Sequence, residues 1–362
     1  MIREKIGILC PNPDILFHYQ GILSHLQESD FDVIATSYDD AFLDILDDYP
    51  HVYAHPLIQQ KITYRITLSH YYLLYYDQVI NGVNTGAKMY LPEILGKTNV
   101  RLMYALGKDY WNYADWNKIY DAHLCFGPWQ AQKLAHFGSQ IHEVGYPRYD
   151  HFFEPGLDVS KIKAQLNIAT DRPVIVWLPT KTQHTINEFK SQIAALTVDY
   201  QVILKPHPAS WEDESELMSE LETENWFLMR EHIDNQLLFA ITDFVLCDYG
   251  GPPFGAIYTD QNLLLLDHAL DQQFELSDHP FDLDHPKDIQ HLNPSETLLR
   301  EHIAHVRPQD SIEKQLQDKV LWETQKSVRT ELRKTFFSDN YGKSAKEAAQ
   351  ILQGLLAQKK PK

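Results

Sequence analysis

Short apolar runs that stop at polar residues constrain the fold of this chain more than any other feature of its sequence. The clearest is residues 202–204, Val-Ile-Leu, followed at once by Lys205, Pro206, His207 and Pro208. Uninterrupted β-branched and aliphatic residues are typical of a strand buried on both faces. Each proline lacks an N–H and keeps the residue before it extended. We therefore expect Lys205 and His207 just beyond the carboxyl end of a parallel strand, where open α/β sheets bind ligands.

Two later apolar runs repeat this pattern. Residues 244–247 lead into Asp248, a tyrosine, Gly250 and Gly251, and residues 263–266 lead into Asp267. The first run predicts a strand, a glycine turn and a helix, in which the backbone approaches a phosphate closely at the helix N-terminus. Glycine pairs also occur for conformational reasons alone, and a histidine after a strand can simply bond locally. The segment also lacks the G-x-G-x-x-G fingerprint of dinucleotide sites.

Several motifs resemble the CDP-glycerol glycerophosphotransferase family. Residues 145–150 are similar to its G-Y-P-R-x-D segment, residues 179–181 to its P-T-x-R turn, residues 205–208 to its K-P-H-P segment, residues 248–251 to its D-Y-S-S segment with glycines for serines, and residues 340–345 to its closing D-G-K-A-[ST] stretch. The resemblance extends over roughly residues 95–355.

This resemblance implies the GT-B fold, in which two Rossmann-like domains with parallel sheets face one another across a cleft. It implies an acceptor-side domain of residues 1–155, to which a last helix of residues 344–358 returns, and a nucleotide-donor domain of residues 170–335. A length of 362 residues independently suggests about two domains. The alternation of strand-like and helical stretches indicates the α/β class. Proline and glycine near both ends of residues 150–171 predict a hinge there.

The implied activity is the transfer of glycerol phosphate, or a related alditol phosphate, from a CDP-linked donor to a cell-surface polymer or glycolipid acceptor. The expected catalytic residues are His207 and Asp109. His207 and Lys205 would stabilise the pyrophosphate and the leaving nucleotide. The expected donor-binding residues are Lys205, Arg148, Thr180, Lys181, Asp248, Gly250 and Gly251. No metal ion or cofactor is implied.

Leu106 departs from the family in a way that bears on the chemistry. It stands where the family carries the histidine proposed to deprotonate the acceptor hydroxyl, and leucine cannot move a proton. Asp109 is the nearest substitute, because desolvation raises the pKa of a carboxylate toward the working pH. The alternative for Asp109 is a helix cap or a surface acid. His18, after the first predicted strand, is a reserve candidate for the base.

Other functions remain open at this level. A glycosyltransferase with a nucleotide-sugar donor would use the same charges, whereas Leu106 favours a non-catalytic nucleotide- or glycan-binding protein. An epimerase would need paired acids, for which Asp109 and Asp115 are the candidates. The aromatic tract of residues 107–117 suits stacking on a sugar or base, or a domain interface. Residues 64–76, rich in tyrosine, predict a packed helix of the first domain.

Net charge and hydropathy indicate which binding partners and which cellular compartment to expect. A formal net charge of −18, from 32 basic and 50 acidic residues, argues against nucleic acid as a partner. No signal peptide or membrane-length apolar run is evident, so we expect a cytoplasmic protein. Lysines at 359, 360 and 362 leave open a peripheral contact with the inner face of the membrane. Cys10, Cys125 and Cys247 are expected as small core residues, and the histidines at 279, 285 and 291 as solvated side chains.

Overall fold

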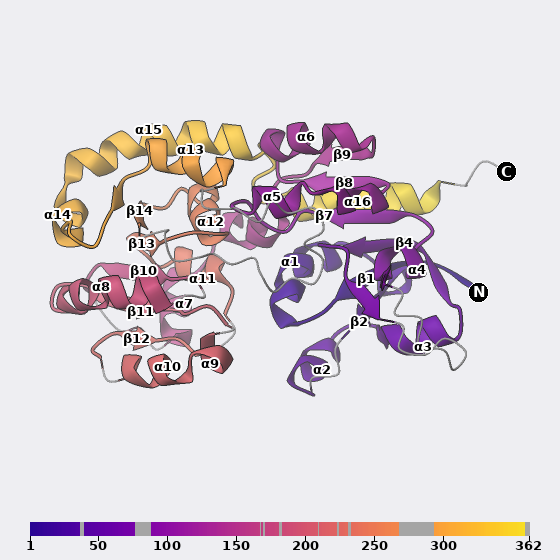
Figure 1. Ribbon diagram of the computed structural model, residues 1–362, viewed down its shortest axis with the longest axis horizontal. Helices are drawn as coiled ribbons and strands as arrows, with labels where there is room; N and C mark the ends of the chain where they lie inside the picture. The colour runs from indigo at the N-terminus through magenta and orange to yellow at the C-terminus, as the bar shows by residue number, and fades with distance from the viewer. Residues whose placement is uncertain are drawn as a thin grey trace. The chain divides into compact units, whose positions relative to one another are not determined.

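The computed structural model describes residues 1–36, 40–76, 88–166, 168, 171–180, 183–208, 210–222, 224–230, 233–267 and 293–358. The chain forms two compact units, whose elements are labelled in Figure 1. The first consists of Met1–Tyr104, Tyr113–His151 and Phe336–Lys362, and the second of Ala105–Asn112 and Phe152–Thr335. The sequence did not predict that Ala105–Asn112, which contains Leu106, belongs to the second unit.

The first unit is built on a parallel sheet with the strand order β3-β2-β1-β4-β7-β8-β9. Its strands are β1 (Ile2–Cys10), β2 (Phe31–Ala35), β3 (His51–Tyr53), β4 (Thr63–Ser69), β7 (Asn99–Leu102), β8 (Ala122–Cys125) and β9 (Gln140–Glu143). The strand order reverses between β1 and β4. In open α/β sheets this reversal marks the place where ligands bind, just outside the carboxyl ends of the strands.

The helix predicted for residues 64–76 is wrong. The chain there forms β4 and then β5 (Leu74–Tyr76), which pairs antiparallel with β6 (Lys88–Tyr90). Since β4 lies between β1 and β7, Tyr64, Ile66 and Leu68 are all buried. An element that is apolar all round fits a central parallel strand as well as a buried helix, and the sequence pattern alone does not separate the two.

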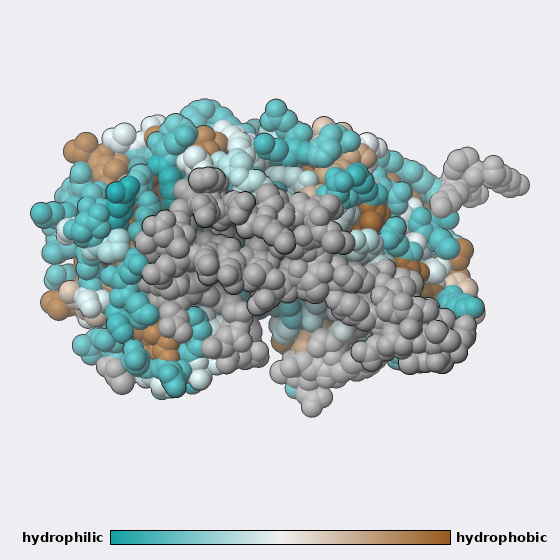
Figure 2. Space-filling view, viewed as in Figure 1, coloured by the Kyte–Doolittle hydropathy of each residue, from teal (hydrophilic) through white to brown (hydrophobic). Residues whose placement is uncertain are grey.

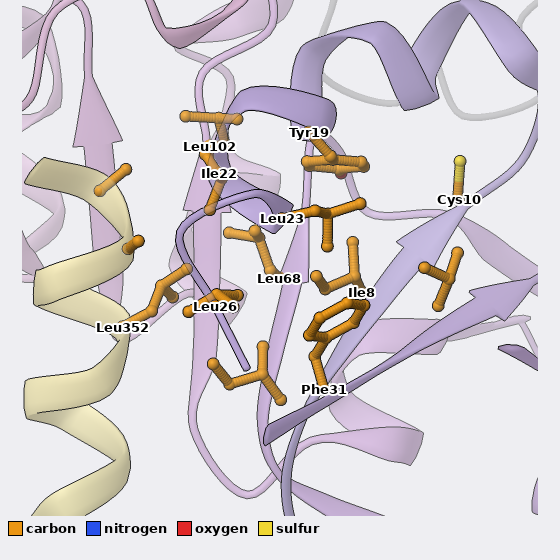
Figure 3. Packing of buried hydrophobic residues seen from close by; sticks show 14 of the residues in the cluster. Ile8, Cys10, Tyr19, Ile22, Leu23, Leu26, Phe31, Leu68, Leu102 and Leu352 are labelled. Atoms are coloured by element: carbon orange, nitrogen blue, oxygen red, sulfur yellow. The ribbon is translucent and has the colours of Figure 1, made fainter. Parts of the chain in front are cut away.

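Helices α1 (Pro13–Leu23) and α16 (Ser344–Ala357) pack against each other in the first unit, although they lie at opposite ends of the sequence. Asn12 begins α1, because its side chain accepts a hydrogen bond from Ile15 N at 3.0 Å. Leu352 of α16 belongs to the same buried cluster as Ile22 of α1, and Figure 3 shows it near Leu26. The last helix therefore completes the hydrophobic core of the first unit.

Two residues of the 145–150 motif anchor α16. Asp150 Oδ2 accepts a hydrogen bond from Ala345 N at 2.6 Å, within the first turn of the helix. Gly145 has φ 88°, and a Cβ atom at this position would lie 2.3 Å from Ser344 Oγ. Only glycine fits both the backbone conformation and the close approach. This motif therefore has a structural task in addition to any role in binding.

The second unit is built on another parallel sheet, with the order β12-β11-β10-β13-β14-β15. Its strands are β10 (Val174–Leu178), β11 (Gln201–Leu204), β12 (Phe227–Leu228), β13 (Phe244–Cys247), β14 (Leu263–Leu266) and β15 (His305–Val306). The predicted strands at residues 202–204, 244–247 and 263–266 are present. The order of this sheet reverses between β10 and β13. Its core includes Trp177 of β10, Phe189 of α8 (Gln183–Leu196) and Leu246 of β13.

The remaining helices are short, apart from α15. In the first unit they are η1 (Glu28–Asp30), α2 (Asp40–Leu46), α3 (Ala54–Gln59), α4 (Leu91–Leu95), η2 (Asp115–Ile119), α6 (Pro128–Leu134), η3 (Ala135–Phe137) and η4 (Pro147–Phe153), which runs into the second. In the second they are α5 (Asp109–Asn112), α7 (Val159–Gln165), α9 (Ser210–Asp213), α10 (Ser215–Leu221), α11 (Asn235–Phe239), α12 (Pro252–Tyr258), α13 (Pro294–His302), α14 (Ile312–Gln317) and α15 (Lys319–Phe336). Two parallel sheets with intervening helices confirm the predicted α/β class.

The predictions for the cysteines are confirmed, since Cys10, Cys125 and Cys247 are buried and unpaired. Within the described ranges, no helix is both long and apolar enough to cross a bilayer. On the face shown in Figure 2, the described residues are mostly hydrophilic and the hydrophobic ones form small separate groups. Lys181, the histidines at 279, 285 and 291, and the lysines at 359, 360 and 362 lie outside the described residues.

Candidate functional site

The strand order of the second sheet reverses between β10 and β13, and we call this place its switch point. The carboxylate of Asp248, which is fully buried just after β13, organises it. It accepts hydrogen bonds from the backbone N–H of Thr180 at 3.0 and 3.1 Å and from the Thr180 hydroxyl at 3.0 Å. It also accepts from the Thr185 hydroxyl at 2.5 Å and from Tyr249 N at 2.8 Å. Thr180 follows β10, so Asp248 ties together the two loops on either side of the strand-order reversal. Asp248 therefore fixes these loops, and its role in donor binding remains a prediction.

The glycine turn after Asp248 differs from the predicted phosphate cradle. Gly250 has φ 81°, which favours glycine, and its N–H donates to Glu296 Oε1 at 2.8 Å. The other oxygen of Glu296 accepts from Asn293 Nδ2 at 3.0 Å. Helix α12 then begins with Pro252 and Pro253, which have no N–H to offer. A donor phosphate at Gly250 would therefore have to replace the carboxylate of Glu296.

Glu296 is an unusual partner for this turn because it is 4 % exposed. Burial raises the pKa of its carboxyl group above the ordinary value, and the hydrogen bonds from Gly250 and Asn293 oppose that rise. Glu296 belongs to none of the sequence motifs, and Gly250, which it contacts, lies 46 residues before it in the chain.

Arg300 is a second functional candidate that the sequence did not reveal. Its Nε donates to Asp267 Oδ1 at 2.7 Å and its Nη2 donates to the carbonyl of Asp248 at 2.7 Å. The guanidinium lies 4.2 Å from the centroid of the Tyr249 ring. Its Nη1 is buried and has no hydrogen-bond partner among the described residues. A buried cation with one unused donor at a strand end suits an anionic ligand.

Lys205 and His207 lie beyond β11, as predicted. The backbone N–H of Lys205 extends the ladder to the carbonyl of Trp177 at 3.0 Å, and its Nζ donates to Asn235 Oδ1 at 2.7 Å. His207 is exposed, and its carbonyl accepts from Ser210 N at 2.9 Å. Lys205, His207 and Arg300 thus follow or flank three strands of one sheet. Their roles in donor binding remain predictions.

Asp109 has a structural task in the second unit. Its Oδ2 accepts a hydrogen bond from Ser295 N at 3.0 Å and another from the Ser295 hydroxyl. Ser295 lies in the first turn of α13, where backbone N–H groups lack helical partners, so Asp109 caps this helix from a distant segment. The segment is further held by a hydrogen bond from Asn293 Nδ2 to the carbonyl of Gly107 at 3.1 Å. To act as a base, the carboxylate would have to release Ser295.

Arg148 lies in the first unit, and its role in donor binding remains a prediction. Its Nη1 lies 2.9 Å from Nε2 of His18, the reserve candidate for the base. His18 is 4 % exposed, and burial together with the charge of Arg148 lowers the pKa of its imidazole well below the ordinary value. In the described part of the chain, no group of three or more histidine, cysteine, aspartate or glutamate side chains is arranged to hold a metal ion.

The two units define a class of protein. Each contains a parallel sheet whose order reverses once, and polar side chains gather beyond the reversal, which is the Rossmann-like arrangement of GT-B proteins. The chain is similar to the wall teichoic acid polymerase TagF in a structure soaked with CDPG, at 14% identity, over 98% of this chain and 89% of that chain, with a TM-score of 0.63. It is also similar to HepE from Anabaena in complex with UDP and glucose, at 12% identity, over 98% of this chain and 100% of that chain, with a TM-score of 0.57.

A UDP-N-acetylglucosamine 2-epimerase gives a third likeness, at 14% identity, over 100% of this chain and 99% of that chain, with a TM-score of 0.58. At these identities the likenesses establish the fold, and the GT-B prediction is confirmed. Residues 130–261 match the family described as CDP-Glycerol:Poly(glycerophosphate) glycerophosphotransferase. This match confirms the resemblance predicted from the motifs and supports the assignment of the chain to the transferases. No curated protein gives a significant match.

Proposed function

We propose that this protein transfers glycerol phosphate from CDP-glycerol to a hydroxyl group of a polymer acceptor. The observation that carries the proposal is the edge of the second sheet, where Asp248 holds the switch-point loops and cations flank it. The sequence motifs at residues 179–181, 205–208 and 248–251 lie inside the segment that matches the glycerophosphotransferase family.

The side chains at this edge divide into two tasks. Lys205, His207 and Arg300 would neutralise the pyrophosphate of the donor, which gains negative charge on the leaving CMP during transfer. Asp248 and Thr180 would keep the loops in the conformation that receives it. No step of this chemistry requires a metal ion when fixed cations supply the positive charge.

The proposal also names a polymer as the acceptor and a peripheral contact with the membrane. TagF is described as a wall teichoic acid polymerase, and a polymer of this type offers a terminal hydroxyl as the nucleophile. A peripheral contact with a membrane, at which such a polymer would be presented, is part of the proposal. Vesicle co-sedimentation of the full chain tests it separately from transfer.

Calorimetric titration of CDP-glycerol, CMP, UDP-glucose and UDP into the full chain tests the donor. We expect binding of CDP-glycerol and CMP, weakened about tenfold or more in Lys205→Met and His207→Ala, since a charge-assisted hydrogen bond is worth about 1.5–3 kcal/mol. Lys190→Met is the matched control, because Lys190 forms an exposed ion pair with Glu220 in the same unit.

The same preparation is then given CDP-[14C]glycerol and a glycerol-phosphate primer, and radioactivity in the polymer is counted. Binding of UDP-glucose in preference to CDP-glycerol would replace the proposal by glycosyl transfer. Absence of binding to any of these nucleotides would refute the donor site, and binding without incorporation would favour a non-catalytic protein.

A further inference from the structure

The glycine turn after β13 is occupied by a side chain of its own unit. The N–H of Gly250 donates to Glu296 Oε1 at 2.8 Å, and Asn293 Nδ2 donates to the other carboxylate oxygen at 3.0 Å. All three residues belong to the second unit. Gly250 itself is half-buried, so the turn is accessible to solvent. An anion that binds the N–H of Gly250 must therefore compete with a carboxylate that is already there.

An unused charged donor lies next to this turn, on Arg300. Arg300 and Glu296 are four residues apart in α13, so their side chains share one face of the helix. Arg300 Nη2 donates to the carbonyl of Asp248, which is two residues before Gly250. Arg300 is 9 % exposed, and its Nη1 has no hydrogen-bond partner among the described residues. The turn and the guanidinium together therefore offer two donors to an anion, of which Glu296 occupies one.

The guanidinium of Arg300 is fixed by contacts that do not involve Nη1. Its Nε donates to Asp267 Oδ1 at 2.7 Å, and the ring of Tyr249 lies against the guanidinium. Both contacts come from the same unit as the turn. A guanidinium held in this way presents its remaining N–H groups in a defined direction, which is how arginine recognises the oxygens of a phosphate.

The carboxyl group of Glu296 is arranged to take up a proton when an anion binds. Burial raises its pKa, whereas the hydrogen bonds from Gly250 and Asn293 and the charge of Arg300 oppose the rise. A phosphate at the turn would replace the first of these bonds, pair with Arg300 and repel the carboxylate, and each effect raises the pKa further. The charged and titratable groups around Glu296 are Arg300 on α13, Asp248 and Tyr249 after β13, Asp267 after β14 with His305 of β15 beside it, and Asp109 of α5.

We infer that Glu296, as a carboxylate, keeps the turn closed, and that binding of CDP-glycerol opens it. A phosphate group of the donor takes the N–H of Gly250 and Nη1 of Arg300, while Glu296 turns away and takes up a proton from solvent. The inference rests on the function proposed above, and every residue in it belongs to the second unit. Because binding consumes a proton, the donor binds more tightly as the pH falls.

Glu296→Gln is the informative variant, since glutamine has the same size and stays neutral. Its amide oxygen accepts from Gly250 less strongly than a carboxylate does, so the turn opens more easily. CDP-glycerol is titrated calorimetrically between pH 6 and pH 8, where both of its phosphates keep a constant charge. His207→Ala serves as the parent, so that protonation of this predicted donor contact does not contribute.

We expect the affinity of the parent to fall with rising pH, by up to about tenfold for each pH unit. With glutamine at position 296 the affinity should stay nearly constant and should exceed that of the parent about tenfold at pH 8. Repeating the titrations in buffers of different ionisation enthalpy counts the protons taken up. We expect net uptake in the parent and none in Glu296→Gln.

Two further variants complete the test. Glu220→Gln is the matched control, because it removes an exposed carboxylate that pairs with Lys190 in the same unit, and it should keep the pH dependence. Arg300→Lys retains a charge that can pair with Asp267 but has no second N–H group to offer, so it should weaken binding about tenfold or more. Circular dichroism monitors folding, and Glu296→Ala is used if the glutamine variant does not fold.

Equal affinity and equal proton uptake with and without Glu296 would overturn the inference and leave donor binding intact. Weaker binding by Glu296→Gln would overturn it too, because Glu296 would then contact the donor directly. Unchanged binding by Arg300→Lys would exclude Nη1 from the site and overturn that part. Binding by Glu296→Gln alone at pH 8 would support the inference. If no variant and no wild-type protein binds CDP-glycerol, the proposed donor fails, and the inference fails with it.

Discussion

Replacement of Asp248 by asparagine should destabilise the second unit strongly, because this carboxylate is the common acceptor at the switch point. Its two oxygens accept hydrogen bonds from two backbone N–H groups and two threonine hydroxyls, and the side chain is fully buried. The amide nitrogen of asparagine would face donors in place of one oxygen. The two hydroxyls can rotate to accept from it, whereas the N–H of Thr180, now bonded to both oxygens, would keep its bond to one oxygen and face the N–H of the amide with the other.

The expected cost is the sum of two contributions. Charge-assisted hydrogen bonds are worth about 1.5–3 kcal/mol each and neutral ones about 0.5–1.5 kcal/mol, and a buried donor that faces another donor costs up to about 1–3 kcal/mol. Since the rotated hydroxyls recover part of this, we expect a loss of about 2–4 kcal/mol in the free energy of unfolding of the second unit. That is a large part of the stability of a typical domain, which is about 5–15 kcal/mol.

Urea unfolding followed by tryptophan fluorescence measures this loss, since Trp177 and Trp226 are buried in the core of the second unit. Asp310→Asn is the matched control, because Asp310 accepts a backbone hydrogen bond from Arg307 in an exposed turn, and its loss should stay below about 1 kcal/mol. Equal losses in the two variants would refute the role given to Asp248.

Two further predictions concern Glu296 and Gly145. Burial raises the folded-state pKa of Glu296, so its contribution to stability is greatest below its unfolded pKa and is lost as the pH rises through the folded pKa. Glu296→Gln should therefore gain stability relative to wild type as the pH rises from 4 to 7, which urea unfolding at each pH measures. A constant difference over this range would contradict the assignment. Gly145→Ala should lower the free energy of unfolding by about 3 kcal/mol, and Tm by several degrees, because the new Cβ would clash with Ser344. Gly138→Ala is the control: Gly138 has φ 75° but lies in open space, so its replacement should lower the free energy of unfolding only by the backbone strain of about 1–2 kcal/mol. Similar losses at both glycines would exclude the clash.

The sequence determined much of the second unit before the tertiary structure was known. Residues 202–204, 244–247 and 263–266 form strands as predicted, because apolar runs this short that end at proline, glycine or acidic residues favour buried strands of a parallel sheet over helices. Lys205, His207 and Asp248 follow these runs directly, so their placement at one edge needed only the rule that parallel strands end on the same side. Local chemistry of this kind is readable because each signal lies within a few neighbouring residues.

The same argument fails where the partner of a residue is distant in the chain. Glu296 and Arg300 come more than forty residues after Asp248, and only the packing of α13 brings them to the turn. Asp109 seemed free to act as a base because its partner, Ser295, is 186 residues away. The central strand β4 was wrongly predicted as a helix. Because it is buried on both faces, its sequence lacks the alternation of apolar and polar residues that distinguishes a strand from a helix.

The sequence by itself therefore determined the α/β class, the strands of the second sheet and the polar residues that follow them. The tertiary structure alone decided which polar groups are already satisfied by a distant partner and which retain an unused donor or acceptor, as Arg300 does. The physical reason is that hydrogen bonds to buried groups form across the fold, at separations in the chain that no local pattern encodes.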